Sequence, residues 1–152
     1  MTRDPAVTSR IMAAVRNRDT RPELLLRREL HRRGLRYRLR SNIVGKPDLI
    51  FAVARVAVFV DGDYWHGNTW RLRGRKSIEE YYAALTNGEF WYQKISATMS
   101  RDVSVNNALR SEGWLVLRIW ESDIQASLKA NADLVEESVR ARNHTAKGTA
   151  TK

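Results

Sequence analysis

Cysteine is absent from the 152 residues of this chain, which excludes disulfide bonds, thiolate nucleophiles and zinc sites built on cysteine. Long apolar runs are absent too, and none approaches the roughly 20 residues of a membrane-spanning helix. Charged residues interrupt the N-terminal segment, so it does not resemble a signal peptide. We therefore expect a cytoplasmic protein that does not contact a membrane.

Acidic residues are scarce at the start of the chain. The first 40 positions hold 12 of the 21 arginines and only four acids, and the whole chain has a net charge of +10. Because the planar fork of arginine pairs with two phosphate oxygens at once, this bias favours a nucleic-acid partner. Codon usage in a GC-rich genome is the alternative explanation. Hydrophobic content of 43% and charged content of 29% are typical of a folded domain.

Hydrophobic periodicity predicts one α/β domain, with a central mixed sheet flanked by helices. The apolar runs 49–53 and 56–60 should pair as an antiparallel hairpin, and the run 114–120, which follows a long helix, should lie parallel to 56–60 as a crossover. We expect the domain to span 1–142, with 1–19 as a basic DNA-binding arm and 143–152 as a disordered tail. The remaining predicted elements are helices over 8–18, 20–34, 77–85, 89–112 and 122–142, and a strand over 36–40.

Two helix starts have the pattern of a capping box. Thr20 with Glu23 opens the first long helix, and Ser77 with Glu80 opens the short one. The helix over 89–112 should bury a single apolar stripe, made of Phe90, Ile95, Met99, Val103 and Leu109.

Two aspartates lie where apolar strands begin or end. Asp48 precedes the first run and Asp61 follows the second, so a hairpin brings them to one edge of the sheet. Paired carboxylates with a nearby histidine can hold Mg²⁺ and deprotonate a water, which is the equipment of a metal-dependent phosphodiesterase. Each acid taken alone is equally compatible with a plain turn. An EF-hand is excluded, because the sixth position counted from Asp61 is His66 rather than glycine.

His66 is the only histidine close to these acids in the sequence. Its ordinary pKa lies near neutrality, so it could accept a proton from a water that attacks phosphorus, although a lone histidine is more often structural. His31 lies in a basic helix and His144 in the predicted tail, and neither is expected to be catalytic. Tyr64 and Trp65 precede His66, either as core residues or as wedges that enter a base step.

At this point the chain resembles the very-short-patch repair (Vsr-type) endonucleases, over about residues 8–125. This resemblance implies a restriction-endonuclease-like (PD-(D/E)XK) fold and an enzyme that nicks DNA beside a T:G mismatch, using Mg²⁺. The motifs that carry it, in order, are Arg18-Asp19-Thr20-Arg21-Pro22-Glu23, Gly45-Lys46-Pro47-Asp48-Leu49, Val58-Phe59-Val60-Asp61-Gly62, Tyr64-Trp65-His66-Gly67, Phe90-Trp91-Tyr92-Gln93-Lys94-Ile95, Arg101-Asp102 and Gly113-Trp114-Leu115-Val116-Leu117-Arg118-Ile119-Trp120-Glu121.

Roles follow from the resemblance by matching position. Asp48 corresponds to the principal metal ligand, helped by the backbone carbonyl of Val60, and His66 to the histidine that activates water. Glu23 matches an acidic residue of the active site, and Asp102 an aspartate that supports catalysis.

The same resemblance implies how DNA is contacted. Tyr64 and Trp65 match aromatic wedges, and Met12 matches a residue that enters from the opposite groove; on the residues alone, Met12 is equally compatible with anchoring the arm helix. The basic residues expected to bind DNA are Arg10, Arg16, Arg18 and Lys46.

Two departures from the family pattern are informative. The best-studied type of member has a histidine where this chain has Asp61, and that histidine's partner corresponds to Asp102. Two carboxylates there repel unless a cation or a shared proton intervenes, so we expect Asp61 to ligate metal directly. The segment 68–88 is also longer than in those members. No structural zinc is expected, because its ligand positions correspond to Asp63, Asn68, Trp70 and Ser122, and packing or DNA should hold this loop instead.

The leading hypothesis is a monomeric, Mg²⁺-dependent nickase, with one or two ions, that leaves a 5′-phosphate. It would act on double-stranded DNA at a mismatch or a short site, in the nucleoid, with mismatch-repair accessory proteins as further partners. One alternative is a restriction or defence nuclease that cuts both strands. The other is a DNA-binding module without catalysis.

Overall fold

The computed structural model describes residues 19–39 and 42–150. The predicted arm helix over 8–18, with Met12, Arg10, Arg16 and Arg18, lies outside the described residues. None of the helices in the described part is long and apolar enough to cross a bilayer.

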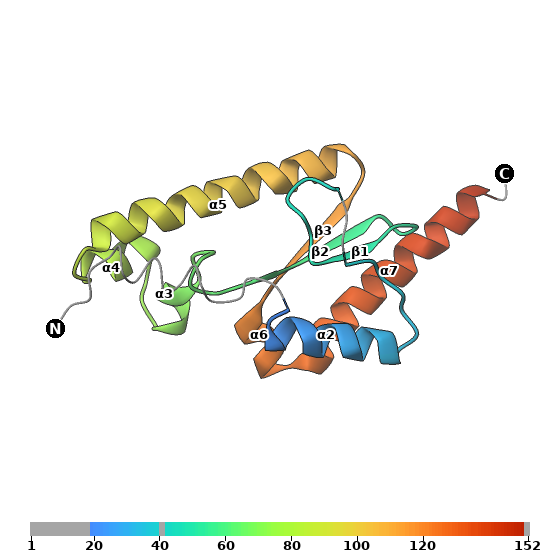
Figure 1. Ribbon diagram of the computed structural model, residues 1–152, viewed down its shortest axis with the longest axis horizontal. Helices are drawn as coiled ribbons and strands as arrows, with labels where there is room; N and C mark the ends of the chain where they lie inside the picture. Colours follow the sequence, from blue (N-terminus) through green and yellow to red (C-terminus); the bar gives the residue numbers. More distant parts are fainter. Residues whose placement is uncertain (1–18, 40–41, 151–152) are drawn as a thin grey trace.

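A three-stranded mixed sheet forms the centre of the fold (Figure 1). Its strands are β1 (Leu49–Phe51), β2 (Val56–Asp61) and β3 (Leu115–Trp120), in the order β1-β2-β3. β1 and β2 pair antiparallel, with Leu49 opposite Val58, and β2 and β3 pair parallel. The predicted hairpin and the predicted crossover are both confirmed.

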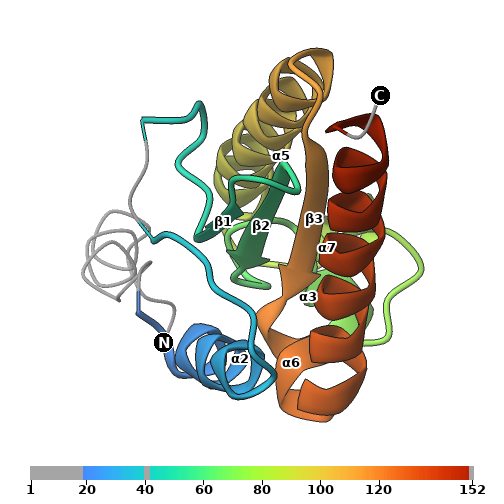
Figure 2. The same cartoon turned by 90° about the vertical axis from the view of Figure 1, so that its right-hand side faces the viewer.

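Helices cover both faces of this sheet (Figure 2). The long helix α5 (Gly88–Ser111) lies on one face, and α2 (Arg21–Arg32), α6 (Glu121–Ala126) and α7 (Leu128–Ala150) lie on the other. Alternation along β2 serves both layers, because Val56 and Val58 join the core with α2 and α7 whereas Ala57 and Phe59 join the core with α5. The predicted mixed sheet flanked by helices is therefore confirmed.

The predicted single stripe of α5 is wrong. Ile95 and Leu109 are fully buried, but Phe90, Met99 and Val103 are exposed. Only the C-terminal part of the helix packs on the sheet, through Leu109. Its N-terminal part extends past the sheet and packs on α4 (Ile78–Ala83), as Figure 1 shows. One helix thus has two partners, one at each end.

Two other predictions need correction. Residues 36–40 do not form a strand among the residues described, since the pairing is limited to a single bridge between Arg38 and Ile50. Tyr37 anchors this segment instead, because its ring packs on Phe51 and its hydroxyl donates to the carbonyl of Arg27. Because β1 has only three residues, it offers few backbone groups with which a further strand could pair.

The C-terminal region differs as well. The predicted helix over 122–142 is two helices, since Ser127 is extended and its hydroxyl accepts a hydrogen bond from the Ala130 N–H. α7 then runs to Ala150 and includes residues 143–150 of the predicted tail. Arg142 helps to hold this helix by donating to the carbonyls of Ala54 and Gly113, and the alanines that follow favour helix.

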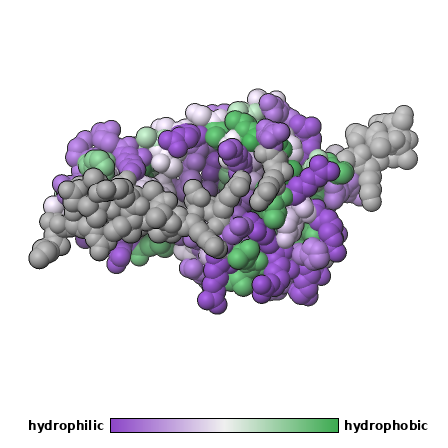
Figure 3. All heavy atoms as spheres, viewed as in Figure 1, coloured by the Kyte–Doolittle hydropathy of each residue, from purple (hydrophilic) through white to green (hydrophobic). Residues whose placement is uncertain are grey.

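The surface is mostly hydrophilic on the face shown in Figure 3. Hydrophobic residues appear there in small separate patches, apart from the atoms drawn in grey. A short helix α3 (Thr69–Leu72) completes the elements of the described part.

The burial pattern of α5 leads to a stability prediction. Leu109→Ala removes a fully buried side chain between helix and sheet and should lower the free energy of unfolding by about 2–5 kcal/mol. Val103→Ala, on the same helix but 57% exposed, is the matched control and should change it by less than about 0.5 kcal/mol. Urea denaturation followed by circular dichroism measures both, and equal effects would contradict the assignment of the two faces.

Candidate active site

The β1–β2 hairpin places Asp48 beside the end of β2. The Asp48 N–H donates to the carbonyl of Val58 at 2.9 Å, and its carboxylate accepts a hydrogen bond from the N–H of Val60 at 2.7 Å. Asp61, the next residue, ends β2 and is 5% exposed. The predicted meeting of the two strand-end acids at one edge is thus observed in the backbone.

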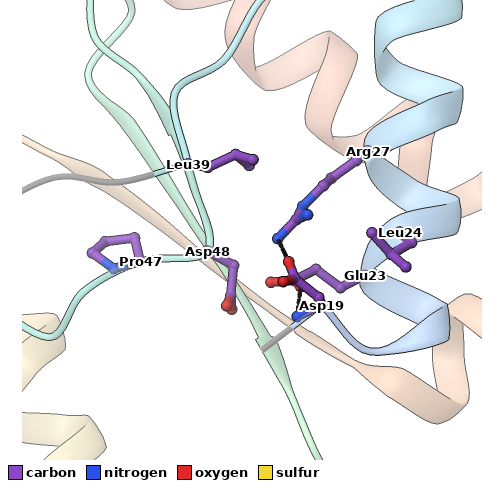
Figure 4. Close-up of a pocket in the computed structure, with 7 residues that line it drawn as sticks. All are labelled: Asp19, Glu23, Leu24, Arg27, Leu39, Pro47 and Asp48. Atoms are coloured by element: carbon purple, nitrogen blue, oxygen red, sulfur yellow. Dashed lines mark hydrogen bonds and ion pairs between the residues drawn. The ribbon is translucent and has the colours of Figure 1, made fainter. Parts of the chain in front are cut away.

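The side chains of the two acids nevertheless enter different groups. Asp48 faces Glu23 of α2 across a cavity of about 460 Å³ (Figure 4). Burial raises the pKa of Asp48 to about 8, assisted by a hydrogen bond with Glu23 and by the nearby charge of Asp61, while the Val60 N–H acts in the opposite direction. The Asp48 carboxyl is therefore protonated more readily than a free aspartate, and the neighbouring Glu23 carboxylate is in contact with one cation, Arg27.

Glu23 is held in place from its own helix. Its carboxylate accepts hydrogen bonds from the Asp19 N–H at 2.5 Å and from Arg27 at 2.8 Å, and it is 2% exposed. The predicted capping box is wrong in part, because the Thr20 side chain makes no cap hydrogen bond and Glu23 reaches the N–H of Asp19 instead. The box of Ser77 and Glu80 at α4 is confirmed in part, because the Ser77 hydroxyl accepts from the Glu80 N–H as predicted, but the Glu80 carboxylate accepts from the N–H of Lys76 rather than that of Ser77.

A second group surrounds His66. Its Nδ1 lies 2.6 Å from Asp102 of α5, and its Nε2 lies 3.9 Å from Asp61. One ligand atom from each of these three residues lies within 4.8 Å of the others, so the group has the geometry to hold a metal ion. Arg118 of β3 also enters it, with Nη1 at 3.1 Å from Asp61 and 3.4 Å from Asp102.

The electrostatics of this group raise the pKa of His66. Burial lowers the pKa of His66, but the hydrogen bond to Asp102 and the charges of Asp61 and Asp102 outweigh it, and the net direction is upward. Burial raises the pKa of Asp61, while His66 and Arg118 oppose the increase.

Arg118 is the functional candidate that the sequence reasoning missed. It is the only charged residue in the apolar run that forms β3, which is a signal that could have identified it. The sequence predicted repulsion between Asp61 and Asp102 in the absence of a cation, and the guanidinium of Arg118 is that cation in the structure.

Tyr64 and Trp65 belong to an aromatic cluster. Their rings lie 5.2 Å apart, and both approach the ring of Trp91 on α5. The ammonium group of Lys94 lies 5.1 Å from the ring of Trp65. Both aromatic residues are half-buried, which fits a role in packing and leaves part of each ring accessible.

Hydrogen bonds join the loop that follows His66 to α6. The Asp63 carboxylate accepts from the Asn68 side chain at 2.7 Å and from the Ser122 hydroxyl at 2.6 Å. Gly67 is at φ +85°, and a side chain there would collide with Met99. The loop was expected to depend on packing or DNA, and the structure adds this direct polar network.

The remaining predicted residues are distributed around the site. Lys46 is exposed in the turn before Asp48, and Val60 is half-buried next to Asp61. His31 is exposed on α2.

A carboxyl pair, a histidine–aspartate pair and an arginine at one edge of a sheet are typical of enzymes that hydrolyse phosphodiesters. The family model described as "DNA mismatch endonuclease Vsr" matches residues 2–72, which include Glu23, Asp48, Asp61 and His66.

Full-length relatives agree with this match. A type II nicking enzyme of Neisseria meningitidis serogroup C is 39% identical over 90% of this chain and 88% of its own length. A type II nicking enzyme of Haemophilus parainfluenzae is 39% identical over 84% and 90%. The DNA mismatch endonuclease Vsr of Escherichia coli K12 is 30% identical over 91% and 82%. The chain belongs to the Vsr family of DNA endonucleases.

The raised pKa of Asp48 predicts how stability depends on pH in metal-free buffer. The folded state holds the Asp48 proton more tightly than the unfolded state does, so this proton stabilises the fold at pH values below the unfolded pKa. The stabilisation is lost as pH rises from about 4 to about 8. The stability of the wild type relative to Asp48→Asn should therefore fall over that window, as measured by thermal denaturation.

Asp133→Asn is the matched control. Hydrogen bonds from Lys129 and Arg33 lower the pKa of Asp133, so its contribution is present at neutral pH and is lost as pH falls below about 4. A pH dependence of the same sign for Asp48 and Asp133 would contradict the prediction.

Proposed function

We propose that this chain is a Mg²⁺-dependent endonuclease that nicks duplex DNA at a mismatch or a short specific site, in mismatch repair. The observation that supports this most directly is the placement of the Asp48–Glu23 pair and the His66–Asp102 pair beside the end of β2. The names of the relatives, nicking enzymes and a mismatch endonuclease, are consistent with a single-strand cut.

The residues around Asp48 fit a hard divalent cation. Carboxylate oxygens are the ligands that Mg²⁺ prefers, and a cation beside Asp48 would oppose the effects of burial and of Glu23 on its carboxylate. Val60 donates its N–H to Asp48, and in a strand the carbonyl of a residue lies on the same side as its N–H. Asp48 and the Val60 carbonyl are thus the proposed ligands. Mg²⁺ bound there would polarise the scissile phosphate and stabilise the leaving oxygen.

His66 is the proposed general base. Its Nδ1 is held by Asp102, so in the neutral ring the proton resides on Nδ1 and the lone pair of Nε2 is available to accept a proton from water. Attack on phosphorus with departure of the 3′-oxygen leaves a 5′-phosphate. Asp61 was predicted as a second metal ligand, but both of its oxygens accept hydrogen bonds from Arg118, so we assign it to the charge network around His66.

DNA binding would use the positive charge of the chain. Lys46 is exposed next to Asp48, and the N-terminal arginines precede the helix that carries Glu23. Tyr64 and Trp65 are proposed to test base stacking, since their cluster lies immediately before His66 in the sequence.

Removal of the proposed base should slow the chemical step. His66→Ala is expected to lower kcat by about 10²–10⁴-fold without loss of DNA binding, since the proton acceptor is lost while the cationic surface remains. His31→Ala removes an exposed histidine from α2 and should leave kcat unchanged. Single-turnover cleavage of a labelled duplex measures the rate, and equal rates in the two variants would rule out this role for His66.

A panel of duplexes tests the substrate. In Mg²⁺, the enzyme should nick one strand of a duplex that contains one particular mismatch, T:G first, and should cut fully paired DNA far less. Asp48→Asn should bind the same duplex and fail to cut it. Products are mapped at base resolution on denaturing gels.

Double-strand breaks in paired DNA would support the restriction alternative and overturn the repair role. An Asp48→Asn variant that cuts as fast as the wild type would exclude the proposed metal ligand.

A further inference from the structure

Arg118 is held rigidly from three sides although it lies in an apolar strand. Its Nε donates to Asn106 of α5 at 2.7 Å, and its guanidinium lies 4.0 Å from the centre of the Phe59 ring. Nη1 reaches both oxygens of Asp61, at 3.1 and 3.2 Å. The side chain is 18% exposed, so these contacts use most of its surface.

The same guanidinium lies between two carboxylates that would otherwise repel each other. Asp61 and Asp102 both face His66, and Arg118 reaches an oxygen of each. Arginine keeps its charge at every pH at which the protein is folded, so this neutralisation is permanent. Neither a proton nor a bound metal ion is required to keep the two acids together.

These contacts also occupy the oxygens that a metal ion would need. Arg118 binds both oxygens of Asp61 and one of Asp102, and His66 binds the other oxygen of Asp102. A divalent cation at this triad would have to displace a guanidinium that is stacked on Phe59 and hydrogen-bonded to Asn106. Asp48, by contrast, lines a cavity, and the ion pair of that cavity joins Arg27 to Glu23 rather than to Asp48.

We propose that Arg118 is a positioning residue: its guanidinium takes the place of a metal ion within the Asp61–His66–Asp102 triad, orients His66, and leaves Asp48 as the anchor of a single divalent-ion site. This inference rests on the divalent-metal chemistry proposed above. It explains how two acids near one histidine can coexist in a one-metal enzyme.

Counting bound Mn²⁺ by isothermal titration calorimetry tests the inference. The wild type should bind one ion per chain, and Asp48→Asn should bind none. Arg118→Gln keeps a polar side chain over Phe59 but removes the charge, so the triad should become a second site and the count should rise to two. Arg118→Lys keeps the charge and should remain at one.

Arg55→Gln is the matched control. Arg55 also stacks on an aromatic ring, that of Trp114, and donates to a backbone carbonyl, but it lies at the opposite end of β2 from Asp61. This variant should bind one ion. For Arg118→Gln we also expect kcat to fall by about 10–100-fold with KM for DNA unchanged, because the network orients the base without contacting substrate. Arg118→Lys should restore part of that loss.

Each result has a defined meaning. A wild type that binds no Mn²⁺ overturns the divalent-metal proposal itself. If the wild type binds one ion, Asp48→Asn binds none and Arg118→Gln still binds one, only the role of Arg118 is overturned. A wild type that binds two ions also overturns the role of Arg118.

Should Arg118→Gln be too unstable for calorimetry, thermal denaturation replaces the count of bound ions. Mn²⁺ should then raise its Tm more than that of the wild type or of Arg55→Gln, because the ion restores the missing charge. Equal shifts in Tm would overturn the inference.

Discussion

The antiparallel pairing of β1 with β2 determines where the acids of the candidate site lie. The backbone of Asp48 continues the ladder to Val58, and its side chain accepts the next free N–H, that of Val60. Because these bonds fix both ends of one short segment, the carboxylate cannot turn away from the end of β2. Glu23 approaches from α2, and the group of His66 lies beyond Asp61, so every acid of the site is positioned relative to this one pairing.

Repulsion between acids is reduced in different ways in the two neighbouring groups, around His66 and around Asp48. Around His66 the negative charge is balanced by Arg118, which the strand β3 delivers from the other side of β2. Around Asp48 the cation in contact is Arg27, which binds the neighbouring Glu23. In the first group the guanidinium lies between the two acids, whereas in the second it lies on the Glu23 side and the pKa of Asp48 is raised.

Local sequence patterns predicted the sheet well because the burial of apolar runs, which decides the sheet, can be read from them. The apolar runs at β1, β2 and β3 can only be buried, and the long helix between β2 and β3 requires a parallel crossover. The approach of Asp48 to Asp61 followed from the hairpin alone. Signals of this kind failed at Arg38, where a single bridge replaces the predicted strand, and at Ser127, where a local N-cap divides the predicted helix.

The side-chain partnerships of the site were harder to predict. Glu23 came from the family resemblance and not from any pattern, since its approach to Asp48 depends on how α2 packs on the sheet. Arg118 was overlooked because its role needs the positions of three other elements, those bearing Asp61, Asp102 and Asn106. The sequence indicated that Asp61 and Asp102 would repel each other, but only the folded structure showed that Arg118 lies between them.

The N-terminal part of α5, which extends past the sheet, has an evolutionary consequence. Its N-terminal part packs with α4 and the aromatic residues near Trp91 in a small cluster separate from the two cores against the sheet (Figure 1). Substitutions confined to that cluster should combine almost additively with changes in the sheet, because distant sites share few neighbours. Lineages can therefore vary this appendage, and with it the surroundings of Tyr64 and Trp65, without rebuilding the hydrolytic machinery.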